Sequence, residues 1–172
     1  MSPADSVKKR HQNPGKSRER AKNKILEFQD DILGPFSYDK PSEVTKVYWI
    51  VAGRKKGRYP DPTPFNGKWL AFAPLEKIDE TWAKIKKATE DGLLGSSSKV
   101  STARENPNAP NRRTKVVCVY TYDCRDETDL RRIREALRSI GITQRIPYKT
   151  DMDTIEGKYV VRGDRRISKY YE

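Results

Sequence analysis

The stretch Asn66-Gly67-Lys68-Trp69-Leu70-Ala71-Phe72 decides the fold through the elements that come after it along the chain. Residues 68–73 predict a β-strand, and an amphipathic helix comes next. Its apolar stripe is Ile78, Trp82, Ile85 and Ala88, and Gly92 closes it. Two further strands are predicted at 99–104 and 115–122, on either side of a polar loop. Elements in this order leave one concave, positively charged sheet face.

The remaining segments complete an α+β pattern. Residues 44–52 are rich in Val, Ile, Tyr and Trp and predict a strand. Asp126 is a good N-cap for a helix that ends at Gly141. Two or three short strands are expected at the end of the chain, at 144–148, 158–162 and 166–170, with a hairpin turn before the last one. The fold class is therefore α+β: a curved antiparallel sheet with helices packed on one face.

Charge and polarity divide the chain into three parts. Residues 1–16 are polar without a hydrophobic period and are expected to form a disordered basic tail. Residues 17–34 predict an amphipathic basic helix, and residues 44–172 a single α+β domain. The chain holds 36 Lys and Arg against 24 Asp and Glu, a formal net charge of +12. Such a balance favours polyanionic partners, although it also serves solubility alone.

Catalytic and metal-binding patterns are scarce. His11 is the only histidine and lies in the expected tail, which excludes Ser-His-Asp and Cys-His sites and most metal sites. Cys118 and Cys124 are too few for a disulfide framework, and reduced thiols fit a cytoplasmic protein. No apolar run is long enough to span a membrane. We expect a monomer that needs no cofactor and no metal.

Basic residues offer a more specific signal. Arg104, Arg112, Arg113 and Lys115 fall within one predicted strand–loop–strand unit, where guanidinium groups can bind phosphate. Lys68 and Lys99 are expected behind them, and Tyr59 is a candidate for stacking on a base. A solvated hairpin tip is the alternative explanation of the same residues. Trp69 and Trp82 are expected in the core, and Phe65 is expected to pack its loop onto the sheet.

The order of these motifs resembles the cap-binding translation initiation factor 4E family. The likeness covers about residues 44–148 and lies in Gly67-Lys68-Trp69-Leu70, the Trp82 helix and the two strands after it. It implies the fold of that family, with phosphate bound at the places of Arg104 and Lys115. The family also clamps a methylated base between two tryptophans. Here no Trp lies between Trp49 and Trp69, so recognition of a methylated cap is not supported.

Residues 44–172 resemble more closely the basophilic-leukaemia-expressed protein family, which has archaeal and bacterial relatives. The strings that carry this likeness are Ser98-Lys99-Val100-Ser101-Thr102-Ala103, Val119-Tyr120-Thr121-Tyr122-Asp123 and Ser168-Lys169-Tyr170-Tyr171-Glu172. That family shares the cap-binding fold and sometimes carries a phosphothreonine-lyase label. Known lyases of that kind use a Lys base and a His acid. Lys99 can stand for the base, but the predicted domain has no His for the acid.

Three functions stay open from the sequence. The first is a binding module whose basic concave face holds a phosphate-rich ligand, RNA or a nucleotide. The second is a phosphate-ester lyase or transferase with Lys99 as the base. The third is an adaptor that docks through its basic tail and helix on a ribosome or another acidic assembly. We expect a binding protein rather than an enzyme.

Overall fold

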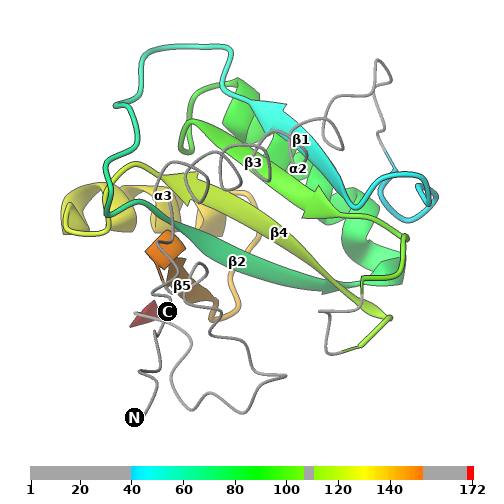
Figure 1. Cartoon of the computed structure of the whole chain (residues 1–172). Coiled ribbons are helices and arrows are strands. Elements are labelled where there is room, and N and C mark those ends of the chain that lie inside the picture. The colour runs from blue at the N-terminus through cyan, green and yellow to red at the C-terminus, as the bar shows by residue number, and fades with distance from the viewer. Residues whose placement is uncertain (1–39, 107–110, 153–169) are drawn as a thin grey trace, which may run out of the picture.

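Six antiparallel strands form one sheet in the part of the chain that the computed structural model describes, residues 40–106, 111–152 and 170–172 (Figure 1). The strand order is β1-β3-β4-β2-β5-β6. The strands are Trp49–Gly53 (β1), Gly67–Pro74 (β2), Ser97–Ser101 (β3), Thr114–Thr121 (β4), Pro147–Thr150 (β5) and Tyr170–Tyr171 (β6). Neighbours in the sheet are mostly far apart along the chain, so long connections cross the molecule.

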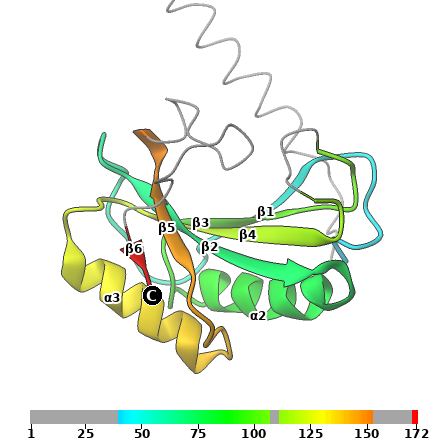
Figure 2. The ribbon, with the colours of Figure 1, turned by 90° about the horizontal axis from the view of Figure 1, so that it is seen from below.

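The two α-helices of the described residues pack on the same face of this sheet (Figure 2). A short 3-10 turn, η1 (Leu75–Lys77), leads from β2 into α2 (Ile78–Glu90), and α3 (Glu127–Ser139) follows β4. The stripes that predicted the helices are buried, namely Ile78, Trp82, Ile85 and Ala88 in α2 and Leu130, Ile133 and Leu137 in α3. This confirms the α+β class, with an antiparallel sheet and helices on one face.

The helix ends follow from local chemistry. The Asp126 carboxylate accepts a hydrogen bond of 3.1 Å from the backbone N–H of Asp129, which is the predicted N-cap of α3. Gly92 and Gly141 follow the two helices with φ of +81° and +96°. Only glycine adopts this region without strain, so the chain can turn away sharply at both places.

The core lies between the helices and the inner sheet face. Alternate residues of β2 point toward the helices, beginning with Trp69 and continuing with Ala71 and Ala73, and all three are buried. Trp69 is 1% exposed, and Trp82 on α2 is fully buried. Both tryptophans therefore belong to the core, as their spacing predicted.

The bounds of β2 and β4 lie within one residue of those predicted, whereas those of three other strands differ by three residues or more at one end. The strand expected at 44–52 begins only at Trp49, because the preceding backbone bonds a loop instead: the Val44 carbonyl accepts a 3.2 Å bond from the Arg104 N–H. For the same reason the strand expected at 99–104 ends at Ser101. The strand expected at 144–148 is shifted to Pro147–Thr150, where it pairs with β2.

Several predictions fall outside the described residues. They are the tail at 1–16, the helix at 17–34, the strand at 158–162, the hairpin turn at Gly163-Asp164 and nearly all of the strand at 166–170.

Candidate functional site

The sheet face turned away from α2 and α3, here called the outer face, collects polar and aromatic side chains from adjacent strands. Strand pairing places Lys99 of β3 opposite Cys118 of β4, and Lys68 of β2 opposite Tyr120 of β4. Side chains alternate between the two faces of a strand. Because Val100 and Trp69 point into the core, their neighbours Lys99 and Lys68 point to the outer face.

Four of these residues form what we call the outer-face cluster: Trp49, Lys99, Tyr120 and Lys68. The Lys99 Nζ lies 4.3 Å from the centroid of the Trp49 ring and 5.6 Å from that of Tyr120. The Lys68 Nζ lies 5.6 Å from the same Tyr120 centroid. Each ammonium therefore rests on the electron-rich face of an aromatic ring, which attracts cations. Cations and rings alternate across the neighbouring strands.

Lys99 is a largely buried cation that forms no hydrogen bond or ion pair within the described part of the chain. Its ammonium lies against the two rings, and the Asp151 carboxylate attracts it only from beyond ion-pair distance. Burial lowers the pKa of Lys99, because water stabilises the charged form and little water reaches it. An anion placed beside the ammonium would oppose this effect. The position therefore favours a negatively charged ligand.

A third lysine, Lys149, lies next to Lys68 on the outer face. Lys149 of β5 is the register partner of Lys68, and both residues are buried, at 5% and 8% exposure. The Lys68 Nζ forms a 2.5 Å ion pair with the Asp151 carboxylate. The described outer face thus carries three lysines and this one paired carboxylate, so its charge is positive. Sequence reasoning missed Lys149 and Asp151.

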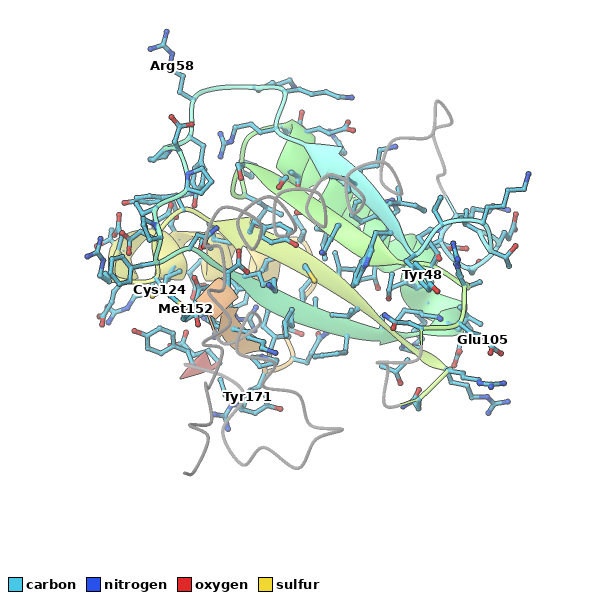
Figure 3. All side chains as sticks on the ribbon, in the orientation of Figure 1. Tyr48, Arg58, Glu105, Cys124, Met152 and Tyr171 are labelled. Carbon is cyan, nitrogen blue, oxygen red and sulfur yellow. The ribbon has the colours of Figure 1, made fainter. Side chains whose placement is uncertain are left out.

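The predicted arginine cluster lies at one end of the sheet, beyond the ends of β3 and β4. The Arg104 guanidinium stacks over the Tyr48 ring at 3.9 Å and donates a 2.6 Å bond to the Lys46 carbonyl. Arg112 forms a 2.8 Å ion pair with Glu105, and both side chains are mostly exposed. Figure 3 labels Tyr48 and Glu105 at this end. Arg104 and Arg112 are therefore brought to one region, each with a partner of its own.

The other two predicted phosphate ligands take different positions. Arg113 is exposed, and its backbone carbonyl accepts a 2.8 Å bond from the Leu75 N–H. Lys115 points to the same inner face of the sheet as Val117, whereas Val116 between them points to the outer face. Lys115 is therefore only 8% exposed, and burial lowers its pKa. Neither residue belongs to the outer-face cluster. Their role in ligand binding stays a prediction.

Tyr59 packs on the side of α3 and not on the outer face. Its hydroxyl donates to the Asp129 carboxylate of α3, its ring meets Tyr122 edge-on at 5.6 Å, and the Arg54 guanidinium lies 5.0 Å from its centroid. Burial raises the pKa of Tyr59. The ring is therefore partly buried and packed against other side chains beside α3. Its role in stacking on a base stays a prediction.

Phe65 differs from its expected role. It was expected to pack its loop onto the sheet, but it is 47% exposed, and the Arg125 guanidinium covers its ring at 3.9 Å. Arg125 is itself held by bonds to the Asp123 carboxylate, which lower the pKa of that carboxyl. These residues lie at the end of the sheet where Figure 3 labels Cys124 and Met152, opposite the Arg104 end.

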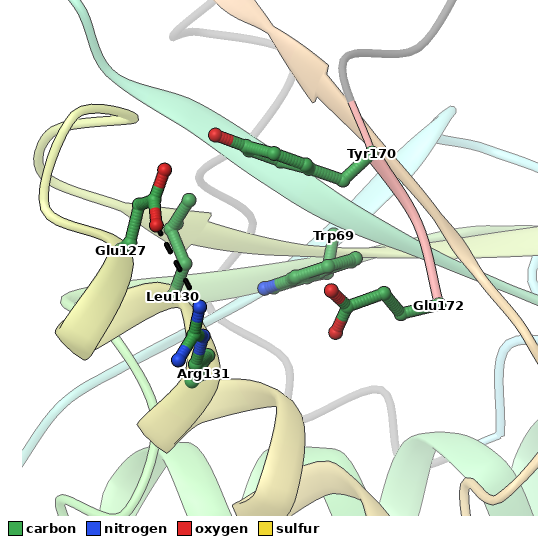
Figure 4. A pocket seen from close by; sticks show the side chains of 6 residues that line it. All are labelled: Trp69, Glu127, Leu130, Arg131, Tyr170 and Glu172. Carbon is green, nitrogen blue, oxygen red and sulfur yellow. Dashed lines mark ion pairs between the residues drawn. The ribbon is translucent and has the colours of Figure 1, made fainter.

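A small cavity of about 50 Å³ lies on the helix side (Figure 4). It is lined by Trp69, Glu127, Leu130, Arg131, Tyr170 and Glu172. The Trp69 Nε1–H is buried there without a hydrogen-bond partner among the described residues. Sites for small organic ligands are several times larger than this cavity, so it does not hold a nucleotide.

Two other kinds of site are not found in the described ranges. No three His, Cys, Asp or Glu side chains gather there in a way that would hold a metal ion. No helix of residues 40–106, 111–152 and 170–172 is long and apolar enough to cross a membrane.

Comparisons with known proteins place these observations in a family context. The profile of the family described as basophilic leukemia-expressed protein Bles03 matches residues 64–155, which is more than half of the chain. This segment contains Lys68, Lys99, Tyr120 and Lys149, but Trp49 precedes it.

Solved structures with a related chain path are 4E proteins of two nematodes, the group that the motif order resembles. One is eIF4E-3 of C. elegans in complex with the 4E-binding protein Mextli and a cap analog. Its sequence is 16% identical to this chain, the match covers 80% of this chain and 78% of that chain, and the TM-score is 0.46. Ascaris suum eIF4E-3 with the m2,2,7G cap has 18% identity, coverage of 74% and 72%, and a TM-score of 0.41. The same protein with the m7G cap has 18% identity, coverage of 49% and 50%, and a TM-score of 0.39.

Proposed function

The chain belongs to the family of basophilic leukemia-expressed protein Bles03, and from that premise we propose that its outer face binds a phosphate-rich ligand, RNA or a nucleotide. One observation carries the proposal. The Lys99 ammonium lies between the Trp49 and Tyr120 rings and forms no ion pair with a carboxylate in the described part of the chain. A cation and two rings in one place match the phosphate and the base of a nucleotide.

Phosphate supplies what Lys99 lacks. A buried ammonium loses much of its hydration, and its pKa falls as a result. A phosphate oxygen within hydrogen-bond distance would restore a charge-assisted interaction, which is stronger than one between neutral groups. Lys68 and Lys149 lie on the adjacent strands and add to the positive potential. The site therefore favours a ligand with more than one negative charge.

The rings supply surfaces for bases. Trp49 comes from β1 and Tyr120 from β4, and both are only partly buried. Bases stack on such rings without much sequence preference, because every base has a π-face. Arg104, Arg112 and Arg113, at the end of the sheet nearest Trp49, are proposed to contact phosphates of a longer strand.

RNA binding by the full chain tests this proposal. Fluorescence anisotropy with labelled single-stranded RNA should show affinity that falls by about 0.7 log units per contacted phosphate for each tenfold rise in salt. Lys99→Met should weaken binding about fivefold, the effect of losing about 1 kcal/mol of charge contact. Lys55→Met is the matched control, because Lys55 is exposed and already paired with Glu90 at 3.1 Å. Binding that is absent or independent of salt would refute the proposal.

A lyase acting on a phosphate ester is the second candidate, and the lowered pKa of Lys99 favours it. A lysine with a depressed pKa is neutral more often and is a better base. The described residues offer no histidine as the acid, since His11 lies outside them. Incubation with a phosphothreonine peptide decides the matter: phosphate release by the wild type that Lys99→Ala abolishes would establish an enzyme.

A further inference from the structure

We propose that Lys99 makes the outer face discriminate against ligands whose base carries a positive charge. The inference rests on the proposed function and names the class of ligand: nucleotides with neutral bases. Its basis is that each ring of the outer-face cluster already has one of the protein's own ammonium groups within cation–π distance, Lys99 of β3 at Trp49 and Lys68 of β2 at Tyr120.

The geometry of the rings carries the first step. The Lys99 Nζ is 4.3 Å from the Trp49 centroid, well within the range at which a ring attracts a cation, and it also approaches Tyr120. Tyr120 has Lys68 at 5.6 Å in addition. Both rings of the outer-face cluster therefore have an ammonium within cation–π distance. A ligand that stacks on either ring lies next to a positive charge.

Coulomb repulsion carries the second step. The Lys99 ammonium covers one face of Trp49 at 4.3 Å, so a cationic base stacked on the other face would lie about 8 Å from it. Two like charges at this separation weaken binding about fivefold when solvent screens part of the interaction. A swing of Lys99 away from the ring would not remove the effect, because Lys99 would then lose its own contacts with Trp49 and Tyr120. A neutral base meets neither penalty.

The charge of Lys99 also favours the phosphates of a ligand over a cationic base. Since no described carboxylate pairs with Lys99, its charge is available to the phosphates of the ligand. In a site that selects a cationic base, carboxylates and free ring faces gather around the base. In the described outer face the one ion-paired carboxylate is Asp151, and Lys68 already occupies it at 2.5 Å.

The test compares GTP with N7-methyl-GTP on the full chain. These nucleotides share their phosphates and differ by one methyl group and one positive charge on the base. Quenching of tryptophan fluorescence gives both dissociation constants at mildly acidic pH, where the methylated base keeps its charge. We expect GTP to bind about fivefold more tightly.

Variants separate charge from shape. Lys99→Arg keeps the charge and should keep the preference, whereas Lys99→Met should bind GTP more weakly and lose most of the preference. Lys55→Met, which changes an exposed and paired lysine, should behave as the wild type.

Two failures are distinguishable. If both nucleotides bind and the wild type holds the methylated one equally or more tightly, the inference is overturned while the proposed function stands. If neither nucleotide nor RNA binds, the proposed function is overturned and the inference with it. The wild-type comparison decides the inference even if Lys99→Met does not fold.

Discussion

Replacing Arg134 by Met should destabilise the fold measurably. Arg134 is fully buried, and its guanidinium donates three hydrogen bonds to backbone carbonyls. The acceptors are Ile142 at 2.8 Å, Gln144 at 2.7 Å and Glu172 at 3.2 Å. One side chain thus ties α3 to the segment before β5 and to the strand end after β6.

The size of the effect follows from the carbonyls left behind. The Glu172 carbonyl keeps its bond from the Ile146 N–H, so the Ile142 and Gln144 carbonyls lose the partner that Arg134 supplies. Gln144 is exposed and its carbonyl can bond water, whereas a buried acceptor such as that of Ile142 costs about 1–3 kcal/mol without a partner. Removal of the buried guanidinium returns part of this, because burial disfavours its charge and lowers the pKa of Arg134. The net loss is about 2 kcal/mol, or about 6 °C in Tm for a domain of this size.

The assay is thermal and urea unfolding followed by circular dichroism. Arg131→Met is the matched control, because Arg131 lies on the exposed side of the same helix with a 3.7 Å pair to Glu127. Exposed pairs contribute about 1 kcal/mol or less, so the control should melt within a few degrees of the wild type. Equal Tm values for the Arg134 and Arg131 variants would show that the buried bonds contribute nothing measurable.

Three further predictions concern other parts of the molecule. Gly95→Ala should prevent native folding, because the added Cβ would lie 1.7 Å from the Tyr120 carbonyl oxygen. Gly53→Ala is the control and should fold normally, because its Cβ would meet no atom within 4 Å. Circular dichroism of both variants checks this. Affinity for an anion should fall as the pH rises toward 10.5, the ordinary pKa of lysine, because burial lowers the pKa of Lys99 below that value. Constant affinity in a titration series from about pH 7 to about pH 10 would contradict this. Cys118 should resist alkylation in the native state and react after unfolding, since burial raises the pKa of its thiol; mass spectrometry of native protein labelled at Cys118 would disprove it.

The sequence was sufficient for the helices because their signals are local. A stripe such as Ile78, Trp82 and Ile85 recurs at the helical period, and Asp126 caps its helix through a residue three positions away. Arg134 escaped prediction because it occupies a core position of α3, and a guanidinium is expected there only once the carbonyls of distant segments are known.

Strand pairing limited prediction of the site. Lys68 and Lys99 were predicted as ligands, but Trp49 and Tyr120 become their neighbours only through registers that join residues far apart in the sequence. Alternation along the strand already indicates that Lys115 shares the inward face with Val117, which argues against its predicted place in a phosphate site. The pairing of Lys149 with Lys68 depends on a strand whose predicted bounds were shifted.

The order of the strands along the chain also determines how long β2 lacks its partner strand during synthesis. Among described strands, β2 pairs along its whole length only with β4, and β4 begins at Thr114, after 39 intervening residues, 75–113. A ribosome that adds about 5–20 residues per second needs about 2–8 s for that interval. During this interval β2, which carries Trp69, Leu70 and Phe72, has been synthesised but its partner β4 has not. Each nascent chain therefore passes through a period of aggregation risk, and truncation near residue 113 would make that period permanent.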